Sequence, residues 1–370
     1  MTICCIAPGT FPFPPAPCTS VEIYLWHLAR ELSRTEPILL YGKTDAVSAS
    51  DPLSYLRHVL RDVKKHPAEP SIIHIENRIP FLPKIKKTFP RVPLVLNLHS
   101  NVLIQELPKL ILRKAFHHLD ALVVNSRFLQ GDLLVRYPFL PEEKVHVIHP
   151  GIDLAQFPSR FRATGAALRA EVRAKHQITP EQQIVLTAGR FTPRKGIAEL
   201  LDAFRIVHAA HPHSVLWIIG GSPRNAEHPF HNLIREKAAE LPVHFFGFLP
   251  QSELPNYYAA ADVFVCPSQL PEAFGLVNLE ASAAALPVVA SGRWGLTESV
   301  AQDVSGRLVE EFTNPAAFAV EINRLLADPD RAAQLGRSGR NWVERHFSWE
   351  ITARQFLALY ERTKKGRLLN

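Results

Sequence analysis

Two short stretches of this 370-residue chain carry side chains that could hold an anion and a set of hydroxyl groups. The first is GRFTPRKG (189–196), where Arg190 and Lys195 stand just before an amphipathic helical stretch. Positive side chains at a helix N-terminus oppose the helix dipole by ~0.3–1 kcal/mol, so we expect an anion to compensate them. A phosphate fits, because free N–H groups and the two-pronged guanidinium of Arg190 can bind its oxygens. A solvated basic loop is the alternative.

The second stretch, PEAFGLVNLEASAAALPVVAS (271–291), contains Glu272 and Glu280 around the start of an apolar helix. Helix geometry over that spacing would separate the acids by ~12 Å. That is more than the ~5–9.5 Å between the two carboxylates of a glycosidase. We therefore expect the two acids to hold different ends of one extended ligand, with a sugar and a ribose as natural targets. The alternatives are an acid that complements the helix dipole for Glu272 and a solvated helix face for Glu280.

Two further features lie where predicted strands end. His99 follows the strand 93–98, at the edge of a sheet where ligands bind, although a lone histidine there is often structural. Thr19-x-x-Glu22 forms a capping box, which predicts a helix that starts near Ser20 and points free N–H groups toward the same edge.

Several patterns argue against other chemistry. Asp328-Pro329-Asp330 matches a bare D-x-D metal pattern, but it falls between two helical segments, where Pro and Asp form a turn. Gly220-Gly221 does not complete G-x-G-x-x-G, so NAD binding is not supported. Four cysteines lack C-x-x-C spacing and a neighbouring histidine pair, so we expect reduced structural thiols in the cytoplasm and no metal site; these are Cys4, Cys5, Cys18 and Cys266.

Short β-branched runs alternate with amphipathic helical stretches, which is the pattern of a parallel α/β sheet. The alternation is interrupted at 149–180, which we interpret as a linker with a short helix. We therefore expect an α/β fold with two Rossmann-like parallel-sheet domains that face each other across a cleft. The first series of predicted strands is 3–7, 37–41, 71–76, 93–98, 120–124 and 145–148, and the second is 183–188, 214–220, 243–246, 262–266, 287–291 and 306–310.

Composition limits the partners. The net charge of +7 and a pI near 9.3 favour an acidic partner, such as a nucleotide, an anionic polymer or an anionic membrane surface. No recognised nucleic-acid module is present, no run reaches the ~20 apolar residues of a membrane span, and the first residues predict a strand rather than a signal peptide. Basic clusters at 57–65 and 84–91 suit peripheral association with an anionic membrane, with solvated helix faces as the alternative.

Taken together, these stretches resemble the GT-B glycosyltransferases of family 4, the glycosyl transferases group 1 type. CPSQLPEAFGLVNLEASAAALPVVAS (266–291) is similar to the family's E-x7-E segment after a Pro-Ser strand end. AGRFTPRKGIAELLDAF (188–204) is similar to its phosphate loop, and FSWEITARQFLALYE (347–361) to its closing helix. SVEIYLWHLAREL (20–32) and IIHIENR (72–78) look most like spore-coat-associated glycosyltransferases.

This resemblance implies an acceptor domain over 1–160, a donor domain over 161–347 and a helix over 348–370 that packs back on the first domain. It also implies a retaining, metal-independent transfer of a sugar from a nucleotide-diphosphate sugar, which is a co-substrate, with no cofactor. The acceptor would be a hydroxyl of a glycan, a lipid or a surface or spore-coat polymer. By this resemblance, Arg190 and Lys195, beside Gly189, would neutralise the donor diphosphate. Glu280 would bind the ribose and Glu272 the donor sugar, while the backbone amides of Phe274, Gly275 and Leu276 would contact the sugar-phosphate. His99 would approach the reacting sugar.

Three departures from the family pattern stand out. Thr19-Ser20 replaces a Gly-Gly pair, His149-Pro150-Gly151 replaces Pro-Asn-Gly, and Trp294-Gly295 replaces a later Gly-Gly. The lost Gly-Gly pair keeps open the hypothesis of a degenerate, non-catalytic sugar-binding coat protein. A nucleotide-sugar epimerase, which shares this architecture and needs no acceptor, is the other alternative.

Overall fold

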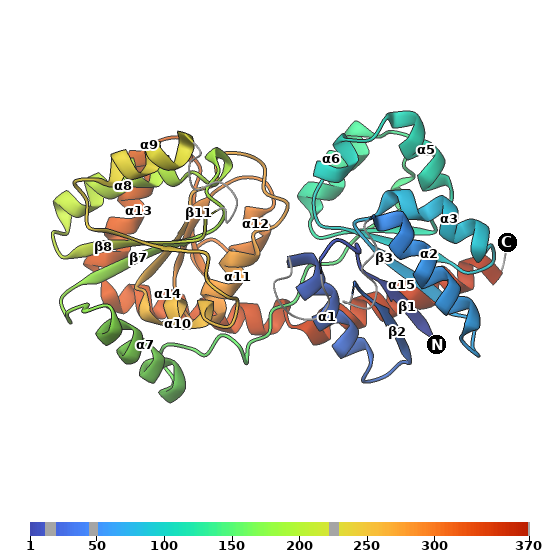
Figure 1. Ribbon diagram of the computed structural model, residues 1–370. Coiled ribbons are helices and arrows are strands. Elements are labelled where there is room, and N and C mark those ends of the chain that lie inside the picture. Colours follow the sequence, from blue (N-terminus) through green and yellow to red (C-terminus); the bar gives the residue numbers. More distant parts are fainter. Residues whose placement is uncertain (12–19, 44–50, 222–228, 369–370) are drawn as a thin grey trace. The chain divides into compact units, whose positions relative to one another are not determined.

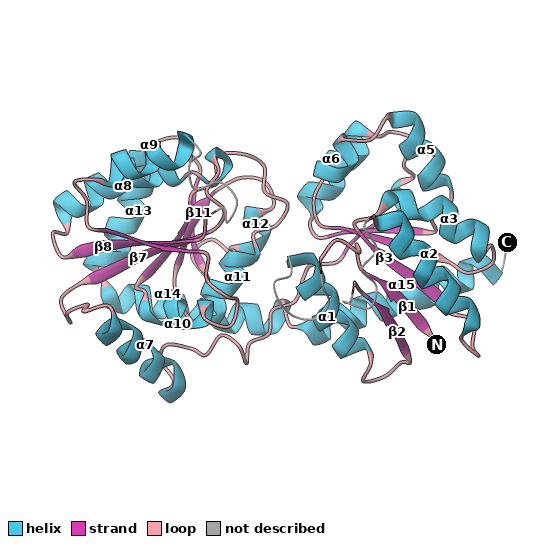
Figure 2. Ribbon diagram, viewed as in Figure 1, coloured by secondary structure: helices cyan, strands magenta, loops and turns pink. Residues whose placement is uncertain are grey.

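A computed structural model shows two α/β units, each built on a six-stranded parallel sheet (Figures 1 and 2). It describes residues 1–11, 20–43, 51–221 and 229–368. The predicted pair of Rossmann-like sheets is confirmed, and each predicted strand is present within one residue of its expected ends. One unit comprises 1–151 with 349–370, and the other comprises 152–348. Residues 152–160, assigned to the first domain from the sequence, belong to the second unit, where Phe157 is buried in the core.

The sheet of the first unit has the order β2-β1-β3-β4-β5-β6. Its carboxyl edge is the place where ligands bind in open sheets of this type. The strands are β1 (Ile3–Ile6), β2 (Ile38–Tyr41), β3 (Ile72–Glu76), β4 (Leu94–Leu98), β5 (Ala121–Val124) and β6 (Val145–Val147). The helices are α1 (Ser20–Leu32), α2 (Pro52–Lys65), α3 (Leu82–Thr88), α4 (Val102–Gln105), α5 (Lys109–His117), α6 (Arg127–Arg136) and α15 (Trp349–Leu368).

Helix α15 joins the first unit although the whole second unit precedes it in the sequence. It packs beside α1, and its Phe356 and Tyr360 are fully buried against Ile3 and Cys5 of β1. Burial of such large aromatic side chains contributes several kcal/mol, roughly, to holding the helix there. The close approach of Trp349 to Gly151 leaves no room for a Cβ atom at that glycine.

The sheet of the second unit has the order β12-β11-β10-β7-β8-β9. The chain runs outward from β7 through β8 and β9, then crosses to β10, so the strand order reverses between β7 and β10. The strands are β7 (Gln183–Ala188), β8 (Ser214–Ile219), β9 (Val243–Gly247), β10 (Val263–Cys266), β11 (Val288–Ser291) and β12 (Gly306–Val309). The helices are α7 (Ala163–Lys175), α8 (Ile197–Ala210), α9 (Pro229–Ala238), α10 (Leu254–Ala260), α11 (Leu276–Ala283), α12 (Leu296–Ser299), α13 (Pro315–Ala327) and α14 (Pro329–His346).

Side chains of this sheet alternate between two apolar cores, as expected for strands covered on both faces. Ile184 and Leu186 of β7 pack with α7, α10, α11 and α14, whereas Val185 packs with α8, α9 and α13. The helices lie in two layers around the sheet (Figure 1).

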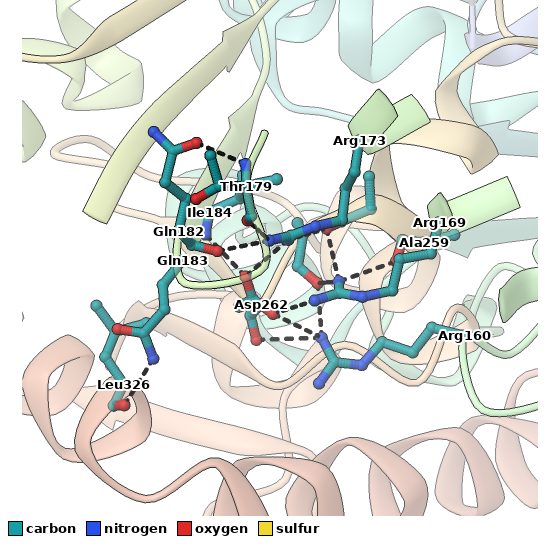
Figure 3. Close-up of polar contacts among 12 residues, drawn as sticks. Arg160, Arg169, Arg173, Thr179, Gln182, Gln183, Ile184, Ala259, Asp262 and Leu326 are labelled. Atoms are coloured by element: carbon teal, nitrogen blue, oxygen red, sulfur yellow. Dashed lines mark hydrogen bonds and ion pairs between the residues drawn. The ribbon is translucent and has the colours of Figure 1, made fainter. Parts of the chain in front are cut away.

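An arginine cluster ties the amino ends of β7 and β10 together (Figure 3). Asp262, just before β10, accepts hydrogen bonds from Arg169 at 2.6 Å, from Arg173 at 3.4 Å and from the backbone of Ile184 at 2.8 Å. Arg160 and Arg169 also donate to the carbonyl of Ala261, beyond the end of α10. Carbonyl groups at a helix end carry partial negative charge, so the cluster is structurally satisfied and fixes the register of the two strands.

The described residues include no helix that is both long and apolar enough to cross a membrane. Asp328 and Pro329 form the predicted turn, since the Asp328 carboxylate caps the start of α14. Three of the four cysteines, Cys4, Cys5 and Cys266, are buried and free. Cys18 and Thr19, with the latter's predicted capping role, lie outside the described residues.

Candidate functional site

The candidate site of the second unit lies at the carboxyl ends of β7 and β10. These strands flank the reversal of strand order, which is where ligands bind in open parallel sheets. The loop after β7 is 189–196, and the loop after β10 is 267–275. The two loops are joined by a hydrogen bond of 2.8 Å from the backbone of Gln269 to the carbonyl of Arg194.

The loop after β7 depends on one glycine. Pro193–Lys195 form a single 3-10 turn, and Gly196 follows with φ of +68° at the start of α8. A Cβ atom at Gly196 would lie 1.9 Å from the carbonyl oxygen of Pro267. Glycine therefore allows both the left-handed backbone and the close approach of the two loops. The predicted site residue Gly189 precedes this turn and lies beside the side chain of Lys195.

Lys195 and Glu272 are brought together across the two loops. The Lys195 Nζ atom lies 2.7 Å from Glu272 Oε1, and the Ser268 hydroxyl donates to the same oxygen at 3.2 Å. The two side chains are only 20% and 15% exposed. Arg190 belongs to the same loop as Lys195 and is exposed to solvent. Its guanidinium makes no hydrogen bond or ion pair with the described residues. Arg190 therefore leaves positive charge available for an anion.

Helix α11 begins beside this pair. Its N-cap is Gly275 with φ of +94°, followed by Leu276, and the cap provides no side-chain hydrogen bond. Phe274 is buried just before it. Glycine is favoured here because this positive φ strains residues that carry a side chain, and a Cβ atom would also contact the side chain of Leu296 at 2.6 Å. Helices α8 and α11 thus both start with a left-handed glycine and no side-chain cap, so their first N–H groups remain available for hydrogen bonding to a ligand.

Glu280 lies one turn into α11 and does not contact Glu272. Its Oε2 accepts a hydrogen bond of 2.8 Å from the hydroxyl of Tyr258, a buried residue of α10. Burial raises the pKa of Glu280, and the hydrogen bond from Tyr258 only partly opposes that rise. One carboxylate oxygen has no hydrogen-bond partner among the described residues. The two acids have different partners, so the structure is compatible with the expected binding of separate ligand groups.

The loop after β11 closes over the loop after β10. Gly295 donates its backbone N–H to the carbonyl of Glu272 at 3.0 Å. The preceding Trp294 has φ of +57°, a conformation that costs a non-glycine residue roughly 1–2 kcal/mol, and its ring packs on Phe312 at 5.0 Å. The family's Gly-Gly pair would adopt this turn without strain, so Trp294 is held there by packing.

His99 lies in the first unit, directly after β4. Its Nε2 atom is 2.7 Å from Oε2 of Glu76, the last residue of β3. The other oxygen of Glu76 is 2.8 Å from Nε2 of His74, and Nδ1 of His74 is 2.6 Å from the hydroxyl of Tyr360 on α15. Burial would raise the pKa of Glu76, but the positive charges that His99 and His74 carry when protonated, together with their hydrogen bonds, outweigh it and lower the pKa to about 2.

Sequence reasoning missed Glu76 and His74, although a signal was present. They stand two positions apart in the apolar strand IIHIE, so both side chains lie on the same face of a buried strand. Buried ionisable groups need partners, and a His-x-Glu pair in such a strand indicates a polar network. The described residues contain no group of three or more His, Cys, Asp or Glu side chains that could hold a metal ion.

Comparison with known proteins agrees with this architecture. Residues 169–342 match the family model described as glycosyl transferases group 1, and residues 21–156 match the model described as glycosyltransferase family 4. YtcC of Bacillus subtilis strain 168, which its name places among the glycosyltransferases, is 30% identical over 78% of this chain and 72% of its own length.

Two full-length similarities complete the picture. Spore coat protein SA of Bacillus subtilis strain 168 is 26% identical over 98% of this chain and 100% of its own length. The crystal structure of Anabaena HepE in complex with UDP and glucose is 20% identical, with a TM-score of 0.74 over 97% of this chain and 99% of that chain. The structural likeness supports the fold.

Proposed function

The chain belongs to the glycosyl transferases group 1 family, and we propose that it transfers a sugar from a nucleotide-diphosphate sugar to an acceptor hydroxyl with retention of anomeric configuration. One observation carries the proposal: Lys195 and Glu272 meet at the carboxyl ends of β7 and β10, between the uncapped starts of α8 and α11. Positive charge, free N–H groups and a carboxylate that could accept hydrogen bonds from hydroxyl groups therefore lie close together, which supports the proposal. The UDP and UDP-glucose complexes of the structural neighbour HepE support a nucleotide-sugar donor.

The leaving group is the nucleotide diphosphate. As the bond between the sugar and the phosphate oxygen breaks, negative charge grows on the diphosphate, and Lys195 and Arg190 would stabilise it. The amides of Gly275 and Leu276 at the start of α11 would bind phosphate oxygens along the donor. Positive charge on side chains thus assists departure, and we propose that transfer does not require a metal ion and survives EDTA.

The two acids take separate hydroxyl groups in this proposal. Glu280 has one oxygen bonded to Tyr258 and one without a protein partner, so it can accept hydrogen bonds from a ribose. Glu272 would accept from hydroxyls of the donor sugar. His99 of the first unit would approach the reacting sugar, which orients it relative to the acceptor.

The ion pair predicts a competition that can be measured. Glu272 occupies Lys195 at 2.7 Å, so a diphosphate must replace that carboxylate as the partner of Lys195. Glu272→Gln removes the competitor, so we expect UDP to bind more tightly while kcat falls, because the amide accepts fewer hydroxyl hydrogen bonds. Calorimetry with UDP and turnover of UDP-sugars measure the two effects. Weaker UDP binding together with unchanged turnover would contradict the assignment of both residues.

Product analysis separates the alternatives. Incubation with donor alone, followed by analysis of the sugar and the nucleotide, distinguishes an epimerase, which converts the donor sugar without an acceptor. With an acceptor glycan present, the anomeric configuration of the product tests retention. A degenerate coat protein would bind UDP-sugar without hydrolysis or transfer. The spore-coat location and the polymer acceptor rest on the likeness to spore coat protein SA, and localisation by fluorescence microscopy in a sporulating host tests them.

An exposed surface of the first unit favours an acceptor at a membrane. Helix α5 exposes Leu110 (65%) and Ile111 (50%) beside Lys109, Arg113 and Lys114. The neighbouring α3 and its following loop expose Lys84, Lys87 and Arg91 from the predicted basic cluster. We propose that this surface binds anionic lipid, because apolar side chains among cations complement a negatively charged bilayer.

Liposome co-sedimentation tests the membrane surface. Leu110→Glu/Ile111→Glu is expected to abolish binding to vesicles that contain phosphatidylglycerol. Ile206→Glu, which changes an exposed residue of α8 in the second unit, is the matched control. Equal binding by both proteins would remove α5 from the interface.

A further inference from the structure

The first unit contains a buried polar network that includes Glu76, His74 and His99. Among the described residues, Nδ1 of His99 has no hydrogen-bond partner. Glu76, at 0% exposure, is the centre of that network and touches two imidazoles, one on each carboxylate oxygen. Because its carboxyl group is ionised at neutral pH, it can only accept hydrogen bonds. His74 and His99 must therefore each carry a proton on the Nε2 atom that faces Glu76.

The proton positions can be followed outward from Glu76. When His74 is neutral with its proton on Nε2, its Nδ1 accepts from the hydroxyl of Tyr360, whose pKa is raised well above its usual value by burial. Asn97 donates to Glu76 Oε1 at 3.2 Å. Oε1 therefore receives two donors, from His74 and Asn97, while Oε2 receives only His99.

His99 is fixed on every side except one. Its backbone N–H donates to the side chain of Asn77 at 3.0 Å, and its carbonyl accepts from Asn125 at 3.1 Å. The ring of Tyr24 packs edge-on against the imidazole at 4.5 Å. Nδ1 makes no hydrogen bond within the described residues, and the side chain is 14% exposed. Nδ1 is therefore the one polar atom of this network that can meet a ligand.

We propose that Glu76 is the positioning residue of His99: it binds Nε2, fixes the tautomer and presents Nδ1 to the donor sugar. This inference rests on the proposed function, since it requires His99 to meet the reacting sugar. The groups that face Glu76 are Cys5 of β1, His74 of β3, Asn97 of β4, Tyr24 of α1 and Tyr360 of α15. His99, which follows β4, also faces Glu76, and its Nδ1 is the one atom that links this carboxylate to a position without a hydrogen-bond partner among the described residues.

Glu76→Gln tests the assignment directly. The glutamine oxygen is expected at the Oε1 position, because two donors converge there, which turns the NH2 group toward His99. His99 must then offer a lone pair at Nε2 and carry its proton on Nδ1. Long-range proton–nitrogen NMR of ring-15N-histidine protein reports the tautomer, and His99→Asn identifies the His99 signal. An unchanged Nε2–H tautomer in E76Q would overturn the proposal.

Kinetics separate positioning from a structural role. E76Q is expected to lower kcat about 10- to 100-fold, by analogy with the loss of a partner that orients a metal-binding histidine, with KM less affected. In the His99→Asn background the same substitution should change kcat by less than about 2-fold, because coupled residues are not additive. Equal losses in both backgrounds would assign Glu76 to stability alone. Glu31→Gln, which breaks the exposed pair with Arg34, is the matched control with unchanged turnover.

Two further measurements keep the outcome decisive. If E76Q does not fold, Glu76→Asp is the second variant, because it retains the charge and the Nε2–H tautomer at a longer distance. Its kcat should lie between those of wild type and an inactive His99 variant. In the His99→Asn background, Glu76→Asp should leave kcat unchanged. A wild-type protein that binds UDP but neither transfers nor hydrolyses the sugar of any nucleotide-sugar would contradict the proposed function. The imidazole spectra would still decide whether Glu76 sets the tautomer of His99.

Discussion

Glu76 in the first unit is a fully buried carboxylate and Glu280 in the second is a half-buried one, and their surroundings are opposite. Glu76 receives hydrogen bonds from His74, His99 and Asn97, and its pKa falls to about 2. Glu280 receives one hydrogen bond from Tyr258, and burial raises its pKa. Both glutamates lie on regular elements, at the end of β3 and inside α11.

The carboxylate of Glu76 has its hydrogen-bond donors within the protein, whereas that of Glu280 has fewer donors. A buried charge is costly unless hydrogen bonds stabilise it, and Glu76 has those bonds in the folded chain. Glu280 has a single such bond, so hydroxyl groups of a ligand would add hydrogen bonds that stabilise its ionised form. On the proposed function, a ligand completes the surroundings of Glu280 in the second unit, while the network of the first unit leaves one nitrogen of the half-buried His99 without a partner among the described residues.

The largest effect is expected at Lys195 in the second unit, the ion-pair partner of Glu272. Lys195→Ala should lower turnover by about 10²–10³-fold, because a charge that stabilises the leaving diphosphate is lost. The unfolding free energy should change by about 1 kcal/mol or less, since the pair with Glu272 is partly exposed. Steady-state kinetics and thermal unfolding measure both. Lys237→Ala, which breaks a surface pair with Asp202, is the control; a similar loss of turnover there would remove the special role of Lys195.

Removing the charge of Glu76 tests the completed network. A folded pKa of about 2, against an ordinary value of 4.5, corresponds to roughly 3 kcal/mol of stability at neutral pH. This stability is present above about pH 4.5 and is lost as the pH falls toward 2. Wild type should therefore exceed Glu76→Gln in unfolding free energy by up to that amount at pH 7, and the gap should close in acid. Urea unfolding between pH 2 and 7 measures it, and a gap that does not depend on pH would exclude the charge as its cause.

The opposite sign is expected for Glu280. A raised folded pKa means that the ionised group destabilises the fold as the pH rises, so Glu280→Gln should increase stability at pH 7 by about 1 kcal/mol, as at other functional sites. The same change should abolish the preference for UDP over 2′,3′-dideoxy-UDP, which is expected to be about 10-fold in wild type for a lost charged hydrogen bond. Thermal unfolding and calorimetry give the two signs. A less stable variant that keeps the ribose preference would reverse the comparison.

The smallest effects concern the tyrosines at the two networks. Tyr258→Phe removes the protein donor to Glu280, so it should raise that pKa further and weaken UDP binding. Tyr360→Phe removes a donor to His74, one step from Glu76, and should cost about 1 kcal/mol in stability with little change in UDP binding. Calorimetry with UDP and unfolding measurements on the two variants test this difference between the surroundings of Glu280 and Glu76. The same profile for both variants would contradict it.

Local sequence patterns were sufficient for the elements and for part of the site. Alternating β-branched runs predicted the strands because each strand is covered on both faces. The loop that contains Lys195 and the loop that contains Glu272 were each identified from a charge or an acid next to a helix start. Their assignment to donor binding stays a prediction, as does the role of His99.

Pairings between distant segments could not be read from the sequence. The Lys195–Glu272 contact depends on the neighbouring positions of β7 and β10, and nothing in either stretch specifies that order. Tyr360 reaches His74 only because α15 returns to the first unit. Helix α7 has 13 residues and is longer than the short helix predicted for the linker, because it packs against α10, which lies far along the chain.

The return of α15 also constrains how the protein is made. Residues 349–370 leave the ribosome after every residue of the second unit, so that unit can finish folding while the first still lacks Phe356 and Tyr360 in its core. A nascent chain halted near residue 348 would therefore expose apolar surface on its earliest part. A nonsense codon near position 348 would therefore damage the unit to which residues 1–151 belong, although those residues are all translated.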